Sequence, residues 1–188
     1  MDIKKRCDWG ESSELMIKYH DKEWGKPVHN DRQIFEFLIL EGFQAGLSWS
    51  TILNKRENFR KAFDNFDYKK IVKYDKRKVA SLLKDEGIVR NKLKVAAAIN
   101  NAKLFIEIQK EFGSFDKYMW QFVGGKTINT KRKSMSQIQA TSKESDELSR
   151  DLKKRGFKFV GSTIIYAHMQ ATGMVNDHVT TCFRYKEV

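Results

Sequence analysis

Proline and cysteine are scarce in this sequence of 188 residues, and long apolar runs are missing altogether. Because Pro27 is the only proline, almost nothing in the chain interrupts helices, which exclude proline from their interiors. No apolar stretch approaches the ~20 residues of a membrane span, and the first residues lead into no signal-type apolar core. We therefore predict a cytoplasmic protein with no membrane partner.

Acidic residues are too few to balance the basic ones. Lys and Arg number 36 against 24 Asp and Glu, which gives a formal net charge of +12. Such a surplus makes a polyanion the leading partner, and nucleic acid the leading polyanion, although a merely basic surface has the same composition. An apolar content of 40% argues against disorder. We predict a single domain over residues 1–188, built of two helical lobes and monomeric.

The spacing of apolar residues predicts an all-α fold. A long amphipathic helix begins near Asn91, and apolar residues that recur every three or four positions, from Ala98 to Phe112, mark it. Further helices are predicted after a cap at Asp31, from Ser48 to Phe63, and over 67–73, 75–84, 114–122 and 145–155. The polar stretch from 124 to 143 has the composition of a loop or flexible linker.

A basic glycine-bearing turn joins the helix over 145–155 to a last helix, which we expect Ser162 or Thr163 to cap and Gly173 to end. Backbone amides at a glycine turn and at a fresh helix N-terminus point outward together, which suits one DNA phosphate. An ordinary connection between antiparallel helices is the alternative. The candidate DNA-binding residues of this turn are Arg155, Gly156, Lys158, Gly161 and Ser162.

The only two cysteines lie at opposite ends of the chain, and each has a histidine nearby. Cys7 is followed by His20, and His178 precedes Cys182 by four residues, which on a helix would put both on one face. Two thiolates and two imidazoles form the tetrahedral set that structural zinc prefers. A Cys/His pair at such a spacing is more often formed by ordinary core or surface residues. The spacing alone therefore leaves both interpretations open, a metal site or ordinary residues.

Several long runs together resemble the bacterial DNA-3-methyladenine glycosylase I family, a branch of the helix-hairpin-helix DNA glycosylase superfamily. In the family's order they are RCDW at 6–9, YHDKEWG at 19–25, LEGFQAGLSW at 40–49, KRENFR at 55–60, KKRGFKFVG at 153–161 and VNDH at 175–178. The runs span nearly the whole chain. The resemblance implies a compact helical fold with a helix-hairpin-helix at about 145–173. It also implies a structural zinc that joins the termini through Cys7, His20, His178 and Cys182.

The resemblance further implies an enzyme of base-excision repair, which hydrolyses the N-glycosidic bond of 3-methyladenine in double-stranded DNA containing alkylated adenine. By resemblance, Glu41 is the catalytic candidate and hydrogen-bonds the base edge. Base-binding aromatic residues are Trp9, Tyr19, Trp24 and Trp49. This set suits the task, because a cationic alkylated base is attracted to π faces and must be extruded from the stack. Gly46 and Leu47 are expected to contact DNA by filling the gap that the extruded base leaves.

Two departures from the superfamily bear on the chemistry. Asn176 stands where most members carry an assisting Asp, and Thr163 stands where bifunctional members carry a nucleophilic Lys. We therefore predict a monofunctional glycosylase; a non-catalytic helix-hairpin-helix DNA-binding module is the alternative. Asp177 is expected to cap a helix that holds His178 and Cys182. Position 16 is often aromatic in the family but is Met in this sequence, so we expect one wall of the pocket to differ.

Overall fold

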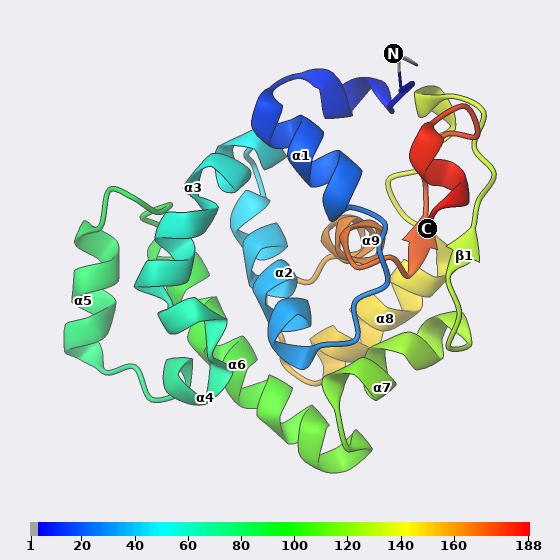
Figure 1. The fold of residues 1–188 in the computed structure, drawn as a ribbon. Helices are drawn as coiled ribbons and strands as arrows, with labels where there is room; N and C mark the ends of the chain where they lie inside the picture. The colour runs from blue at the N-terminus through cyan, green and yellow to red at the C-terminus, as the bar shows by residue number, and fades with distance from the viewer. Residues whose placement is uncertain (1–3) are drawn as a thin grey trace.

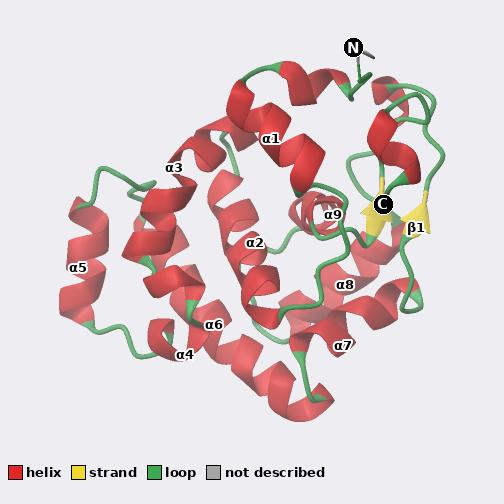
Figure 2. Cartoon of the chain, in the orientation of Figure 1, coloured by secondary structure: helices red, strands yellow, loops and turns green. Residues whose placement is uncertain are grey.

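The chain folds predominantly into α-helices, as the apolar spacing predicted (Figures 1 and 2). The structure is a computed structural model that describes residues 4–188. Its α-helices are α1 (Glu14–Lys22), α2 (Asp31–Gln44), α3 (Trp49–Ala62), α4 (Tyr68–Ile71), α5 (Lys76–Lys84), α6 (Lys92–Phe112), α7 (Phe115–Trp120), α8 (Lys143–Lys154) and α9 (Ser162–Ala171). Two short strands, β1 (Ile128–Asn129) and β2 (Val175–Asn176), pair in parallel. Among the described residues, no helix is both long and apolar enough to span a bilayer.

Side-chain caps explain where most helices begin. The Ser48 hydroxyl accepts a hydrogen bond from an amide in the first turn of α3, and Asn91 does the same for α6. The predicted cap at Asp31 is wrong by one residue, because the Asn30 side chain caps α2. Asp31 instead accepts hydrogen bonds from the Gln109 side chain and from two backbone amides at the start of α7.

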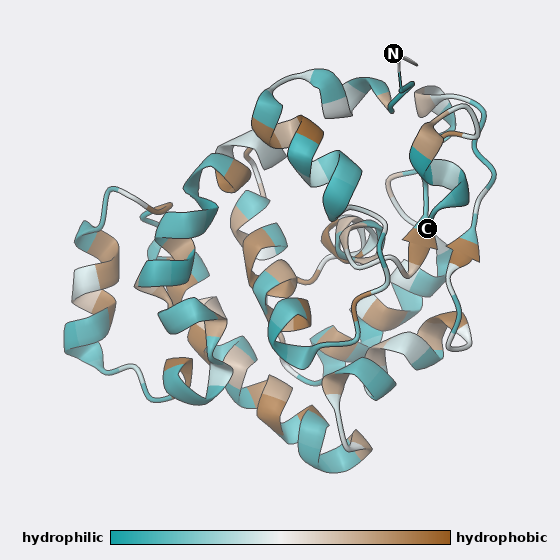
Figure 3. Cartoon of the chain, in the orientation of Figure 1, coloured by the Kyte–Doolittle hydropathy of each residue, from teal (hydrophilic) through white to brown (hydrophobic). Residues whose placement is uncertain are grey.

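The helices surround α9, which is seen end-on near the centre of Figure 1 and packs against α2 and α8. Apolar residues lie mainly on the helix faces turned toward the interior, and polar residues lie mainly on the outer faces (Figure 3). The predicted long helix α6 contributes Val95, Ala102 and Phe105, all fully buried. Phe105 stacks on Phe115 with ring centroids 4.0 Å apart, which ties α6 to α7.

The two ends of the chain lie side by side (Figure 1), and the amide of Phe183 donates to the carbonyl of Lys5 at 2.9 Å. The prediction of a helix holding His178 and Cys182 is wrong. Residues 177–179 follow β2 without regular secondary structure and lead into a turn. The amide of Thr180 donates to the carbonyl of Arg132 at 2.7 Å, so part of the segment bonds a distant part of the chain and not the carbonyl of a preceding helical turn.

Asp177 therefore does not cap a helix. It is fully buried, and its carboxylate accepts hydrogen bonds from the Tyr166 hydroxyl and the Gln170 amide of α9, both at 2.7 Å. A third comes from the hydroxyl of Thr130, just after β1. Asp177 thus ties the C-terminal segment to α9 and to the stretch from 124 to 143. That stretch is mostly loop, as predicted, with β1 and one 3-10 turn within it.

The connection between α8 and α9 covers residues 155–161 and turns at Gly156, whose φ is +98°. The expected caps for α9 are wrong, since Gly161 occupies the N-cap position and no side chain caps the helix. The Ser162 hydroxyl instead lies 2.8 Å from the Ser145 hydroxyl on α8. The first amides of α9 are therefore left without a side-chain acceptor.

Candidate functional site

A cavity of about 280 Å³ opens where α1, α2, α3 and α9 meet. Its lining includes all five residues that the sequence assigned to base binding: Trp9, Tyr19, Trp24, Glu41 and Trp49. These residues come from four separate stretches of the first 49 residues. The fold thus brings the predicted set together at one place.

The walls of this cavity are aromatic. The Tyr19 and Trp49 rings lie 5.3 Å apart between centroids, and Trp9 meets Trp24 edge-on at 4.8 Å. Met16, from the same face of α1 as Tyr19, completes this side. A flat, electron-deficient molecule would find ring faces on more than one side here.

Glu41 is the only ionisable carboxyl of the lining, and it is 4% exposed near the end of α2. Burial raises the pKa of its carboxyl to about 8, because water no longer solvates the charged form. Burial, and next the charge of Glu41, raise the pKa of the Tyr19 hydroxyl. Among residues 4–188, no hydrogen bond or ion pair is formed by the Glu41 carboxyl, which faces the cavity, and the buried indole N–H of Trp49 likewise lacks a partner. Buried polar groups are normally paired, so these two are free to meet a ligand.

Sequence reasoning missed part of the lining. Met135 and Ile138 cover one side from the loop after β1, and Ala167 and Gln170 come from α9. Met135 and Ile138 are the only large apolar side chains between Ile128 and Leu148, and this signal was available in an otherwise polar stretch. The Gln170 amide is oriented by its hydrogen bond to Asp177.

A second cavity of about 200 Å³ adjoins the first and shares Glu41, Gln44 and Ala167 with it. The turn from 44 to 47 forms one side, and the start of α9 with Thr163 forms the other. Gly46 in this turn has a φ of +79° and open space around its Cα, and Leu47 is 42% exposed. The expected DNA-contacting pair therefore projects from the body of the protein, next to the aromatic cavity.

The hairpin residues divide into two groups. Lys158 is exposed, and its backbone amide and carbonyl both bond the Asn101 side chain at 2.9 Å. Arg155, by contrast, contacts Glu111 at 2.6 Å and Asp151 at 2.7 Å, and these two carboxylates pair its charge. This side chain braces α8 against α6, so the phosphate contact predicted for Arg155 finds no support in its geometry.

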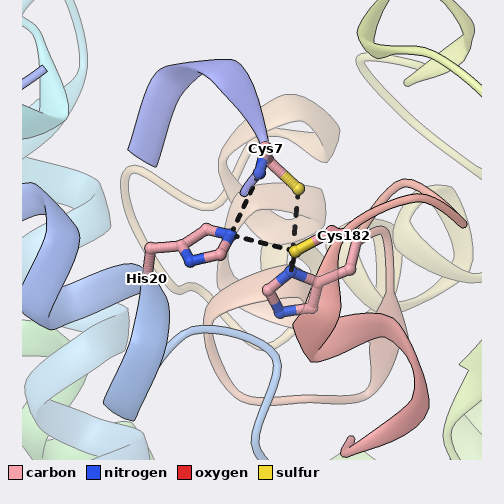
Figure 4. A group of neighbouring side chains, drawn as sticks. Cys7, His20 and Cys182 are labelled. Atoms are coloured by element: carbon pink, nitrogen blue, oxygen red, sulfur yellow. Dashed lines mark hydrogen bonds between the residues drawn. The ribbon is translucent and has the colours of Figure 1, made fainter. Parts of the chain in front are cut away.

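The two cysteines and their two histidines form a buried cluster whose candidate ligand atoms all lie within 4.8 Å of one another. The Sγ of Cys182 lies 3.5 Å from Nε2 of His20 and 3.5 Å from Nδ1 of His178 (Figure 4). The Sγ of Cys7 lies 3.7 Å from the same Nδ1. In a tetrahedral zinc site with ordinary bond lengths, sulfur and nitrogen ligands are separated by about 3.6 Å. These three sulfur–nitrogen distances thus fit the edges of such a site.

The surroundings orient both imidazoles for ligation. Nδ1 of His20 lies 2.8 Å from an Asp21 oxygen, and Nε2 of His178 lies 3.2 Å from the carbonyl of Trp24. Each ring therefore has an acceptor behind it and leaves its other nitrogen facing the cysteines, as metal-binding histidines usually do. The Cys7 thiol, followed by the two imidazoles, lowers the pKa of the Cys182 thiol, which favours the thiolate that binds metal.

Two glycines make room for these rings. A Cβ at Gly10 would lie 2.8 Å from the His20 ring, and one at Gly25 would lie 2.9 Å from Nε2 of His178. Gly25 also has a φ of +80°, which other residues seldom adopt. Both positions are therefore closed to larger residues as long as the cluster keeps its geometry.

The helical fold and its aromatic cavity are those of a DNA glycosylase. The model of the methyladenine glycosylase family matches residues 9–185, and the chain belongs to that family. It is 44% identical to DNA-3-methyladenine glycosylase 1 of Escherichia coli K12 over 96% of this chain and 97% of that one.

Solved structures agree with this assignment. A crystal structure of 3-methyladenine DNA glycosylase I superposes with a TM-score of 0.92 at 46% identity, over 95% of this chain and 98% of that one. The Staphylococcus aureus enzyme, whose structure describes 3-methyladenine recognition, superposes with a TM-score of 0.91 at 32% identity, over 95% of both chains.

Proposed function

We propose that this protein is a monomeric DNA-3-methyladenine glycosylase that hydrolyses the N-glycosidic bond of 3-methyladenine in double-stranded, alkylated DNA. The observation that carries the proposal is the buried, unpartnered carboxyl of Glu41 inside an aromatic cavity. The names of the related proteins support the same substrate.

The cavity suits a base that has been turned out of the helix. A 3-methylated adenine in DNA is cationic, and rings such as those of Trp49 and Tyr19 attract cations over their faces. Its exocyclic amino group can donate to the Glu41 carboxylate. In the free protein, burial keeps this carboxyl largely neutral at pH 7, and a donor with a positive charge favours its ionised form. Trp9 and Trp24 would close the remaining sides of the base.

Glu41 also explains a preference for adenine. The Watson–Crick edge of adenine presents an amino donor where guanine presents a carbonyl acceptor. Opposite that carbonyl the ionised carboxylate would have an unfavourable contact, and the neutral carboxyl would lose the pairing of charge with amino donor that 3-methyladenine provides, so 7-methylguanine and hypoxanthine should be poor substrates. An enzyme discriminates strongly between two bases when the wrong base would leave a buried polar group, here the Glu41 carboxyl, without its partner.

The bond cleavage needs little chemical assistance, because a cationic base is already a good leaving group. Binding and orientation can then supply most of the acceleration. The Asn176 amide donates to the carbonyls of Tyr185 and Val188, so it is engaged in the C-terminal segment and not directed into the cavity. Thr163 lines the second cavity but offers no amine for a Schiff base. Both features favour simple hydrolysis.

DNA would be held at two places. Gly46 and Leu47 would enter the gap left by the extruded base, because they project beside the cavity. Gly156, Lys158, Gly161 and Ser162 would hold one phosphate through the lysine and the uncapped amides at the start of α9.

Release of free 3-methyladenine tests this function. Methylated duplex DNA is incubated with the protein, and liberated bases are separated by chromatography. We expect 3-methyladenine in large excess over 7-methylguanine. Tight binding to the DNA without any released base would instead support a non-catalytic DNA-binding module.

We infer that the Cys/His cluster binds one structural zinc ion per chain. The donor set, the ligand spacing of 3.5–3.7 Å and the acceptor behind each imidazole support this assignment. Four protein ligands would leave no position for a reactive water, so the ion would supply stability by joining the two ends of the chain. Elemental analysis of protein purified without chelator should give about one zinc per chain, and the absence of any bound metal would refute the assignment.

A further inference from the structure

Lys94, in the first turn of α6, has an unusual environment for a lysine. Its side chain is 8% exposed, although lysine is almost never buried unless it is paired. A positive charge in the first turn of a helix also opposes the dipole of that helix. Among residues 4–188, no carboxylate forms an ion pair with it, and burial lowers the pKa of its ammonium group. Lys94 therefore serves something other than α6.

The ammonium group of Lys94 serves the end of α2. Its Nζ donates to the carbonyl of Phe43 at 2.8 Å and to that of Ala45 at 2.6 Å. The last carbonyls of a helix lack partners within it, and a cation there is favoured by the helix dipole. These two carbonyls lie at the start of the turn over 44–47, whose tip carries Gly46 and Leu47. Lys94 thus fixes the base of the turn that we expect to enter DNA.

The same helix holds the hairpin. Two turns further along α6, the Asn101 amide donates to the carbonyl of Lys158 and its oxygen accepts from the Lys158 amide, both at 2.9 Å. Asn100 adds a bond to the carbonyl of Gly156 at 3.1 Å. Lys94 and Asn101 are seven positions apart on the helix, which corresponds to about 10 Å along one face.

Phe159 packs between the two contacts, that of Lys94 with the end of α2 and that of Asn101 with the hairpin. It has a φ of +54°, a conformation that a bulky residue adopts only when its surroundings enforce it. Its ring lies 6.0 Å from Nζ of Lys94, and its Cβ packs on Gly42 of α2, where an added Cβ would come within 3.4 Å. Hairpin, α2 and α6 therefore meet in one tight contact.

We propose that Lys94 is a positioning residue for base extrusion: together with Asn101 it makes α6 a rigid spacer that holds the turn over 44–47 at a fixed distance from the phosphate-holding hairpin. This inference rests on the proposed function. Extruding a paired base requires a wedge to enter the stack while the backbone is held. A base in single-stranded DNA needs no such wedge, so Lys94 should matter for duplex substrates alone.

The test compares Lys94→Met with Lys110→Met, an exposed lysine near the other end of α6. Single-turnover excision of 3-methyladenine is measured on duplex and on single-stranded DNA of the same sequence. For Lys94→Met we expect a loss of about 10–100-fold on the duplex and less than about threefold on the single strand. Binding of free 3-methyladenine, followed by tryptophan fluorescence, should stay at the wild-type level. Lys110→Met should match wild type throughout.

Equal losses on both substrates, or no loss on the duplex, would overturn the role of Lys94. If Lys94→Met does not fold, Lys94→Gln keeps one donor for the carbonyls and should give a smaller loss with the same duplex preference. Asn101→Leu should show that preference as well, because it frees the hairpin end of the spacer. Failure of the wild-type protein to release 3-methyladenine would instead refute the proposed function, so the two failures are distinguishable.

Discussion

The Cys/His cluster and the aromatic cavity adjoin each other, but the polar groups of the cluster have partners whereas two polar groups of the cavity have none. In the cluster every candidate ligand faces three others, and each imidazole has an acceptor behind it. In the cavity the carboxyl of the buried Glu41 forms no hydrogen bond within the described chain, and the buried indole N–H of Trp49 has no partner there either. A region whose polar groups satisfy one another stabilises a fold, whereas one whose groups are left unpaired is prepared for a ligand.

Replacement of the unpaired carboxyl should have the largest effect. Glu41→Gln should lower single-turnover excision of 3-methyladenine by about 10²–10³-fold, since the base loses its charged acceptor. Affinity for undamaged duplex should remain near wild type. Glu107→Gln, at an exposed position on α6, is the control and should be fully active. Full activity and selectivity in a Glu41 variant would remove the basis for assigning the cavity to the base.

The same substitution should raise stability. Because the pKa of Glu41 is about 8 in the folded protein and near 4.5 when unfolded, the folded state retains a proton that the unfolded chain releases between these values. Wild-type stability should therefore decline as pH rises from about 4.5 to about 8. Glu41→Gln should lack this decline and gain about 1–3 kcal/mol at pH 8. Denaturant titrations at several pH values measure both quantities, and identical pH profiles would contradict the unpaired state of Glu41.

Substitution in the Cys/His cluster, whose polar groups have partners, should lower stability. Cys182→Ser should remove the zinc and lower the free energy of unfolding by about 3 kcal/mol, or Tm by ~10 °C, because the two ends of the chain separate. Thr181→Ala, an exposed neighbour, should change neither. Zinc content and thermal unfolding are measured on the same samples. A Cys182 variant that keeps both its zinc and its Tm would show that the cluster is not the metal site.

The smallest effect is expected at the hairpin, which lies outside both regions. Lys158→Ala should weaken binding by about 3–10-fold on any DNA sequence and reduce the slope of log K against log salt by about 1. The control is Lys84→Ala on α5. Fluorescence anisotropy across a salt series provides the slopes. An unchanged slope in Lys158→Ala would exclude a phosphate contact there.

Helices and their beginnings were largely predictable because local chemistry determines them. The apolar repeat of α6 and its Asn91 cap lie within one stretch of sequence, and the structure has both. The cavity residues were found through long family-like runs, since no spacing rule links Trp9 to Trp49. That these residues lie close together in space could be seen only from the complete fold.

The errors over the C-terminal segment and the loop from 130 to 138 have one physical cause, which is pairing between distant segments. The spacing of His178 and Cys182 is that of a helix, but β2 pairs with β1, 47 positions earlier in the register, and the segment after β2 forms no helix at these residues. The same pairing carries the following loop over the cavity, where Met135 and Ile138 form part of the lining. Long-range partners of this kind leave little trace in local sequence patterns.

The ionisation of Glu41 can be observed directly by NMR with ¹³C-labelled glutamate, titrated with and without saturating 3-methyladenine. In the free protein the Glu41 carboxyl should titrate near pH 8, well apart from exposed glutamates. Saturation with 3-methyladenine should lower that pKa, because the amino group of the base donates to the ionised carboxylate. A Glu41 resonance that titrates near 4.5, or that is unaffected by 3-methyladenine, would contradict the assignment of this carboxyl as the unpaired acceptor for the base.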